Sequence, residues 1–296
     1  MLALFLHADD DGLTPASLWS FHSWQWDPGI VLPLLIFGAL YAIGTMRQRN
    51  TNWLRHLLFG TGWLSLVFAL DSPLHPLGEQ LFSAHMLQHE ILILVSAPLI
   101  AASHPGATCL WAFVPRHRSG IGSAVQRIES ARAVRMITAP LAAWIIEAVA
   151  LWAWHVPALY QATLISDAVH AAQHLSFFLS ALLFWSALYG VGRSVMHYGT
   201  ATLYVFGTAA HCSALGALLT FSTVIWYPAY LNTTSAWGLT PLQDQQLGGL
   251  LMWVPSGVVF VIIGLVLFGR WLNEAERRAA LGRVHSLAHA RASEPQ

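Results

Sequence analysis

Long apolar stretches recur along almost the whole of this 296-residue chain. A helix needs about 20 mainly apolar residues to cross the hydrocarbon core of a bilayer. Only 9% of the residues are charged, against about 25% in a soluble domain, which is too little to cover a water-facing surface. The pattern predicts an all-α polytopic integral membrane helical bundle with seven transmembrane helices, over residues 29–46, 55–71, 80–102, 138–157, 168–190, 198–225 and 246–269.

The basic residues orient these seven segments. All fourteen are arginines, and in the seven-span arrangement every one of them falls on the same side of the membrane. Because loops rich in basic residues stay in the cytoplasm, we expect the N-terminus outside and the C-terminus inside. The expected organisation is a periplasmic segment over residues 1–28, one membrane domain over 29–270, and a cytoplasmic tail over 271–296.

The stretches between and around the spans are expected to be mostly irregular. Residues 72–79, 158–167 and 226–245 are predicted to be outer loops, and residues 103–137 to be an inner loop or a helix lying on the membrane. The tail is predicted to form a short charged helix and then to be disordered. An outer interfacial belt ahead of the first span is expected from Trp19, Trp24 and Trp26.

Fifteen histidines are unusual in so apolar a chain, because ionisable groups inside a membrane are costly and usually functional. His85 and His89 lie near the outer end of the third span, and His170 and His174 near the outer end of the fifth. A spacing of four residues puts two imidazoles on one helix face. We therefore predict one metal site from the two pairs, with His155 nearby. The alternative is that the pairs hydrogen-bond different neighbours and never meet.

Other buried polar or soft side chains add candidates. Imidazole suits zinc, copper, iron and nickel, and a thioether favours Cu(I), so Met86 and Met252 are candidate soft contacts. His211, beside Cys212 in the sixth span, is either a metal ligand or an interhelical hydrogen-bonding group. Glu147 either orients a ligating histidine or hydrogen-bonds a neighbouring helix. The two cysteines of the chain are far apart, so no disulfide framework is indicated.

The remaining histidines lie in loops or near helix ends. His75 is expected in the outer loop before the third span. Packing or surface roles are expected for His7, His22, His56, His104, His117, His197, His285 and His289.

Acidic residues are expected near the outer surface and close to the histidines, namely Asp71, Glu79 and Asp244. They would attract cations or cap helices, and capping is expected for Asp71, which precedes a turn at Ser72. Glu90 directly follows His89, but the zinc-protease motif HExxH is absent because Ile93 stands where its second histidine would be. With no P-loop, GxGxxG or CxxC motif, we expect no enzyme and no catalytic residues.

Three sequence blocks occur in the order of a known family. The first is Asp71-Ser72-Pro73-Leu74 with His85-Met86-Leu87-Gln88-His89. The second is Trp154-His155-Val156-Pro157-Ala158-Leu159-Tyr160 with His170, His174 and Phe184-Trp185. The third is Asp244-Gln245-Gln246-Leu247-Gly248-Gly249-Leu250-Leu251-Met252-Trp253-Val254-Pro255. Together they resemble the caa3-type CtaG family of cytochrome c oxidase assembly proteins, which is distinct from the single-span copper chaperone that shares the CtaG name.

The resemblance implies a multi-pass protein of the bacterial inner (plasma) membrane that helps to mature haem–copper oxidase. It would bind copper as Cu(I) and deliver it to oxidase subunit I or to another assembly factor. Two departures concern the surroundings of the ligands: Gln173 stands where many members have Glu, and Glu90 where an apolar residue is usual. The metal-binding role carries over to His85, His89, His155, His170 and His174.

Two other functions compete with copper delivery. A b-type haem protein in electron transfer would also use histidines from facing helices. A metal or proton transporter would use them as relay groups and is marked by discontinuous helices, for which Pro98, Pro140 and Pro255 are candidate kink sites. The formal net charge of zero argues against nucleic acid as a partner.

Overall fold

The computed structural model of the protein describes residues 17–18, 24, 26–48, 52–192 and 196–292, with the backbone alone for residues 280 and 282–292. These residues form helices and no strand, which confirms the predicted all-α class. Six helices are long and apolar enough to cross a membrane, and a seventh span results if one bent pair counts as a single span. The predictions for Trp19 and for the side chains of His7, His22, His285 and His289 concern positions that lie outside the described residues.

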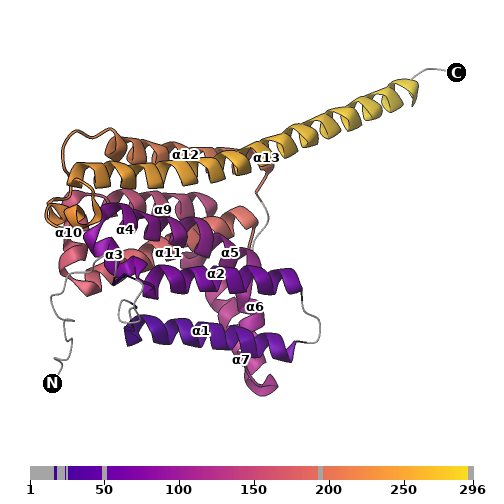
Figure 1. Cartoon of the computed structure of the whole chain (residues 1–296). Helices are drawn as coiled ribbons and strands as arrows, with labels where there is room; N and C mark the ends of the chain where they lie inside the picture. Colours follow the sequence, from indigo (N-terminus) through magenta and orange to yellow (C-terminus); the bar gives the residue numbers. More distant parts are fainter. Residues whose placement is uncertain (1–16, 19–23, 25, 49–51, 193–195, 293–296) are drawn as a thin grey trace.

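The long helices run roughly parallel or antiparallel in one bundle (Figure 1). α12 and α13 pack along each other on one face, and α1 lies at the opposite edge. The long elements are α1 (Pro28–Arg47), α2 (Trp53–Asp71), α4 (Phe82–Glu90) continuing through the π-helix η2 (Ile91–Ser96) into α5 (Ala97–Ser103), α9 (Pro140–Trp154), α11 (Asp167–Tyr189), α12 (Tyr198–Thr220) and α13 (Pro241–Ala292).

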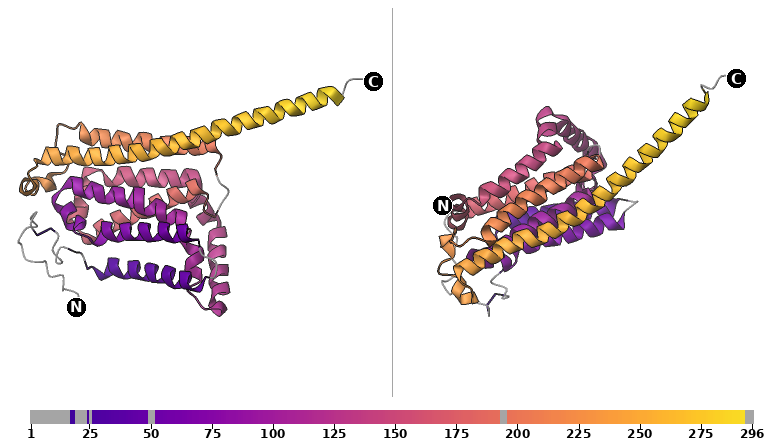
Figure 2. Two further views of the ribbon diagram at one scale, coloured as in Figure 1. Left: turned by 45° about the vertical axis from the view of Figure 1, so that its right-hand side comes forward. Right: turned by 90° about the horizontal axis from the view of Figure 1, so that it is seen from above.

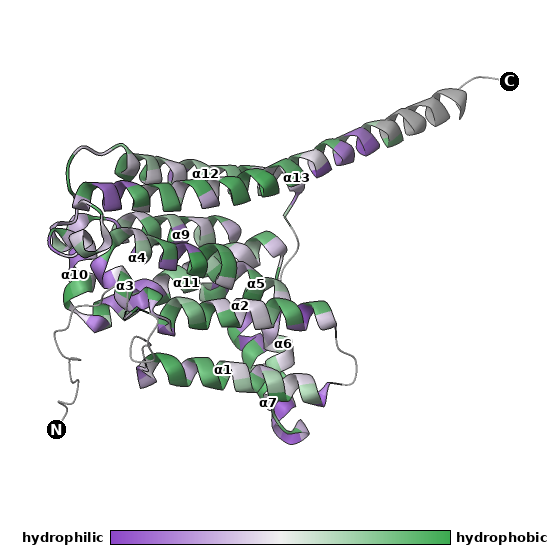
Figure 3. Ribbon diagram, in the orientation of Figure 1, coloured by the Kyte–Doolittle hydropathy of each residue, from purple (hydrophilic) through white to green (hydrophobic). Residues whose placement is uncertain are grey.

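Short helices occupy most of the stretches between the predicted spans. Residues 72–79 and 158–167 were expected to be loops, whereas a helix was one of the two expectations for residues 103–137. Residues 72–79, 103–137 and 158–167 contain, in chain order, α3 (Leu74–Gln80), α6 (Pro105–Leu110), α7 (Pro115–Ser130), α8 (Arg132–Ile137) and α10 (Pro157–Ile165). Two 3-10 turns, η3 (Pro228–Tyr230) and η4 (Thr234–Trp237), lie in the stretch before α13. Polar residues gather around α3 at one end of the bundle and around α7 at the other (Figure 3).

The fourth predicted span is broken. It was expected over residues 138–157, but α9 ends at Trp154 and α10 continues at an angle of 75°. Proline cannot donate to the preceding turn and disfavours helical geometry in the residue before it. Pro157 is the first residue of α10, and Val156 before it is extended, with φ −63° and ψ 125°. The helix therefore ends just before the Pro157 position, and His155 lies at the break.

The third span contains a π-helical stretch that follows directly on the histidine-bearing α4. In this register the amide of Ala97 bonds the carbonyl of Leu92, so the next carbonyl, of Ile93, would need an N–H from Pro98, which has none. The indole Nε1–H of Trp185 on α11 donates to that carbonyl at 2.8 Å. The proline-induced irregularity in one span is thus compensated by an aromatic side chain from another.

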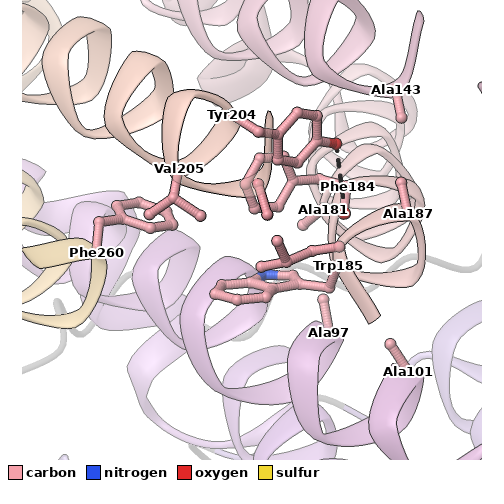
Figure 4. Close-up of a cluster of buried hydrophobic side chains, with 12 residues drawn as sticks. Ala97, Ala101, Ala143, Ala181, Phe184, Trp185, Ala187, Tyr204, Val205 and Phe260 are labelled. Atoms are coloured by element: carbon pink, nitrogen blue, oxygen red, sulfur yellow. Dashed lines mark hydrogen bonds between the residues drawn. The ribbon is translucent and has the colours of Figure 1, made fainter. Parts of the chain in front are cut away.

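Trp185 belongs to the main apolar core between α5, α11, α12 and α13. Figure 4 shows its ring beside those of Phe184 and Phe260, with Tyr204 donating a hydrogen bond to the carbonyl of Phe184 at 3.4 Å. Small residues let helices approach closely where lipid provides no hydrophobic drive. The buried alanines that pack around these rings are Ala97, Ala101, Ala143, Ala181, Ala187 and Ala201.

The C-terminal helix differs from its prediction. α13 is 52 residues long and continues past residue 270 without a break, so that its last part projects beyond the bundle (Figures 1 and 2). Residues after Trp271 are rich in Ala, Leu, Glu and Arg, which are strong helix formers, and Arg278 pairs with Glu274 one turn earlier. A helix through Ala292 therefore replaces the expected short helix and disordered tail.

The close approach of α12 and α13 gives a first testable prediction. A Cβ on Gly249 would lie 2.6 Å from the backbone nitrogen of Thr220 and 2.8 Å from the carbonyl oxygen of Gly216. Gly249→Ala should therefore destabilise the protein by about 1–3 kcal/mol through overpacking, measured as a lower thermal unfolding midpoint in detergent. Gly257→Ala on the same helix is the matched control, because a Cβ there meets nothing within 4 Å. Equal midpoints for both variants would contradict this packing.

Candidate metal centre

The first pair of histidines is positioned by a residue far away in the chain. α4 begins at Phe82 because the buried carboxylate of Asp244 on α13 accepts hydrogen bonds from its first turn. The donors are the amide of Phe82 at 2.6 Å, and the amide and hydroxyl of Ser83 at 3.1 and 2.5 Å. This satisfies amides that a helix N-terminus leaves unpaired and sets the register of His85, one turn further on.

The roles of the acidic residues differ in part from the prediction. Asp244 is fully buried and takes the capping role that was expected of Asp71, whereas α3 has no side-chain cap hydrogen bond. Asp71 is the last residue of α2, is buried, and has an Oδ1 without a hydrogen-bond partner among the described residues. Glu79 is half-exposed, with Oε1 4.0 Å from Nε2 of His75.

The second pair of histidines comes from the first two turns of α11, which faces α4. His85 and His170 stack at 4.9 Å between ring centroids with an interplanar angle of 16°, and His89 lies 5.3 Å from His174. Within each helix, the rings of the two histidines are 4.4 Å and 4.3 Å apart. The structure therefore brings together the four histidines of the two i,i+4 pairs, all of them buried.

Two groups of three histidines have ligand atoms that all lie within 4.8 Å of one another. One group is His85, His89 and His174, and the other is His75, His170 and His174. His174 is common to both. His75 stacks on His170 at 4.8 Å and was missed as a candidate ligand, because its helix was read as a loop. Its only sequence signal is its position ten residues before His85.

Hydrogen bonds distinguish the two groups. The amide Nε2 of Gln88 donates to the carbonyl of Ala69 at 2.6 Å and to Nδ1 of His75 at 3.1 Å. Because Nδ1 accepts, the proton of a neutral His75 ring is on Nε2, and its single acceptor lone pair is already occupied. Burial lowers the pKa of His75 to about 4, although Asp167 and Asp27 act to raise it, so the ring is neutral near pH 7.

The other group has free lone pairs. Nε2 of His85 donates to Oε1 of the buried Gln173 at 3.1 Å, which leaves Nδ1 as the ligand atom. That Nδ1 has no hydrogen-bond partner among the described residues. The same is true of both ring nitrogens of His89 and of Nε2 of His174. Unpaired buried polar atoms are costly, and a metal ion would satisfy all three rings. Three neutral imidazoles fit Cu(I), Zn(II) or another ion that prefers nitrogen.

His155 lies beside this group rather than in it. Its Nδ1 lies 2.6 Å from the carbonyl oxygen of Leu151, so Nδ1 carries the proton, and its Nε2 lies 3.3 Å from the sulfur of Met86. Its ring centroid is 6.4 Å from that of His89. His155 and Met86 thus form an adjacent imidazole–thioether pair. Met252, the other candidate soft contact, is buried in the same apolar cluster as Met86.

Aromatic residues close this end of the site. Tyr160, in the sequence block around the helix break, is fully buried with its ring 5.1 Å from that of His85. Its hydroxyl pairs with that of Tyr230 at 2.8 Å, and Tyr230 donates to the carbonyl of Gly78 at 2.8 Å. Tyr227 donates to the carbonyl of His155 at 2.9 Å. The histidines are therefore shielded from water by α10 and by the turn before α13.

These features define a multi-spanning membrane protein with a buried histidine cluster. The chain belongs to the cytochrome c oxidase caa3 assembly factor family (Caa3_CtaG), whose sequence profile matches residues 39–274. This match confirms the family suggested by the three sequence blocks.

Curated relatives occur in mycobacteria. An uncharacterized protein of Mycobacterium bovis and one of Mycobacterium tuberculosis are each 22% identical over 279 residues, which cover 91% of this chain and 42% of theirs. An uncharacterized protein of Mycobacterium leprae is 22% identical over 276 residues, covering 90% of this chain and 42% of its own. The chain thus spans less than half the length of these relatives. No solved structure matches it.

Proposed function

We propose that this protein binds copper at the histidine cluster and delivers it to haem–copper oxidase, to subunit I or through another assembly factor. The observation that carries the proposal is the group His85, His89 and His174. Nδ1 of His85, both ring nitrogens of His89 and Nε2 of His174 are buried without a hydrogen-bond partner among the described residues. Copper is the cargo, held as Cu(I) by neutral imidazoles. The chemistry is ligand exchange, which requires no covalent catalysis.

A path for the ion follows from the second group of histidines. His75 and His170 lie between the half-exposed Glu79 and the inner ligands, and His174 belongs to both groups. Because Gln88 occupies a lone pair of His75, this outer group would bind more weakly than the inner one. Weakly binding outer ligands would favour transfer of the copper ion between the two groups. His174, which belongs to both, would remain bound while the ion exchanges its other ligands.

The packing of the rings favours an ion over haem. The centroids of the histidine rings on α4 and α11 are 4.9 Å and 5.3 Å apart across the two helices, and His89 also packs against Phe177 at 4.5 Å. A porphyrin would have to separate these rings. Haem absorption in the purified protein would nevertheless contradict copper as the cargo, and its absence with bound copper is expected.

A transporter is the second candidate, and one observation favours it. The break between α9 and α10 makes a discontinuous span beside the histidine cluster, and discontinuous helices are common at substrate sites in transporters. Uptake of copper into liposomes distinguishes the two functions. A copper-delivery protein should load and unload copper without moving it across the bilayer.

The proposed orientation places the histidine cluster on the outer side of the bacterial inner membrane. The arginine-bearing α7 and the histidine-flanking α3 lie at opposite ends of the bundle, and basic segments stay in the cytoplasm. A reporter fused after Arg291 should therefore be active only in its cytoplasmic form. Activity of a periplasmic reporter at that point, with a cytoplasmic reporter silent, would contradict the proposed orientation.

A further inference from the structure

A second cluster of polar side chains lies deeper in the bundle, between α9 and α12. Glu147 on α9 and His211 and Cys212 on α12 each offer a ligand atom within 4.8 Å of the other two. Oε2 of Glu147 is 3.4 Å from Nε2 of His211, and Nδ1 of His211 is 3.8 Å from the sulfur of Cys212. Glu147 therefore contacts His211 and does not orient any of the five predicted histidine ligands.

The atoms of this cluster are poorly satisfied. Oε2 of Glu147 and Nε2 of His211 are buried and, despite their proximity, lack the alignment of a hydrogen bond to each other or to another described group. Oε2 of Glu90 on α4 is also buried without a hydrogen-bond partner among the described residues. Carboxyl and thiol groups inside a membrane are costly unless a cation or a proton accompanies them.

The cluster follows the histidine site along the bundle. Glu147 precedes His155 by two helical turns on α9, about 12 Å at 1.5 Å per residue, and Glu90 is the next residue after His89. The donor chemistry changes along this line. The first group offers neutral imidazoles only, whereas the second adds a thiol and a carboxyl group that can neutralise a cation.

We propose that Glu147, His211 and Cys212 form a second metal site for a thiophilic d10 cation, Cu⁺ or Zn²⁺. Thiolate, imidazole and carboxylate are the ligands of zinc, and thiolate with imidazole also suits Cu⁺. Three protein ligands leave a coordination position open, which permits exchange. The proposal does not depend on copper binding at the histidine cluster, because it uses different side chains from different helices.

The test uses the full-length protein, reduced and stripped of metal in detergent. One arm adds Co²⁺ as a spectroscopic substitute for Zn²⁺ and measures thiolate-to-cobalt charge-transfer absorption. The other adds Cu⁺ without oxygen to the His174→Ala protein and measures sulfur ligation by X-ray absorption. Cys212→Ser should abolish the sulfur signal for the ion that binds. Cys109→Ser, which changes the other free cysteine, is the matched control and should leave it intact.

A second variant keeps the inference testable if Cys212→Ser fails to fold. Glu147→Gln should weaken binding by about 10-fold or more without removing the sulfur signal at saturation. Absence of thiolate ligation by cobalt in the otherwise unchanged protein and by copper in the His174→Ala protein would overturn the second site, as would a signal that survives Cys212→Ser in either arm. Cobalt ligation by Cys212 in a protein that binds no copper at its histidines would refute the proposed function and leave the second site standing.

Discussion

Replacing His174 with alanine should remove copper from the purified protein and oxidase activity from the host, while the oxidase polypeptides remain. His174 is the only histidine that belongs to both groups of ligand atoms among the described residues, so no intact group survives its loss. The loss of affinity should exceed the roughly 10- to 100-fold that removal of an outer partner of a ligand costs. Copper content after dialysis and oxidase activity in membranes are the two measurements.

Two comparisons make this result specific. His89→Ala should also lose copper, because it removes a ligand with two unpaired nitrogens. His117→Ala changes an exposed histidine on α7 and should retain about one copper ion per chain near neutral pH, released by acid because protonation competes with the metal. Full copper occupancy in both His89→Ala and His174→Ala would refute the site.

Removing the side chain of Asp244 should cause the largest loss of stability. Asp244→Ala leaves two buried amides and a buried hydroxyl at the start of α4 without their acceptor. A lost N-cap costs about 1 kcal/mol, and each buried unsatisfied group about 1–3 kcal/mol, so we expect a loss of about 3 kcal/mol or more. Thermal unfolding in detergent measures it.

The same variant should also weaken copper binding, because the cap positions His85 only one turn further along α4. Asp167→Ala is the matched control: Asp167 is exposed in the first turn of α11, and its loss should cost only about 0.3–1 kcal/mol. Asp244→Asn, which keeps one acceptor oxygen, should fall between the two. An unchanged unfolding midpoint in Asp244→Ala would show that the contact across α4 and α13 does not stabilise the fold.

The errors made from sequence have identifiable physical causes. The helix break at His155 was missed because the span was predicted from the length of its apolar run. That criterion takes no account of Pro157, which ends the helix by its local effect on the preceding turn. Residues 72–79 were read as a loop because a short amphipathic helix carries little periodic signal, and His75 was lost with it. The polar partner of Glu147 could not be predicted from sequence. Whether it orients a ligating histidine or contacts another group on a neighbouring helix depends on which helix lies beside α9.

The sequence by itself determined that this is an all-α protein with helices able to span a membrane, and that two histidine pairs each occupy one helix face. Both conclusions depend on local rules, the length of an apolar segment and the 3.6-residue helical repeat. Only the tertiary structure decided that the two pairs meet, that Gln88 occupies a lone pair of His75, and that Asp244 caps α4 from the last long helix. Relative position and register of packed helices depend on contacts between residues far apart in the chain, such as Asp244 with Phe82, which no local spacing encodes.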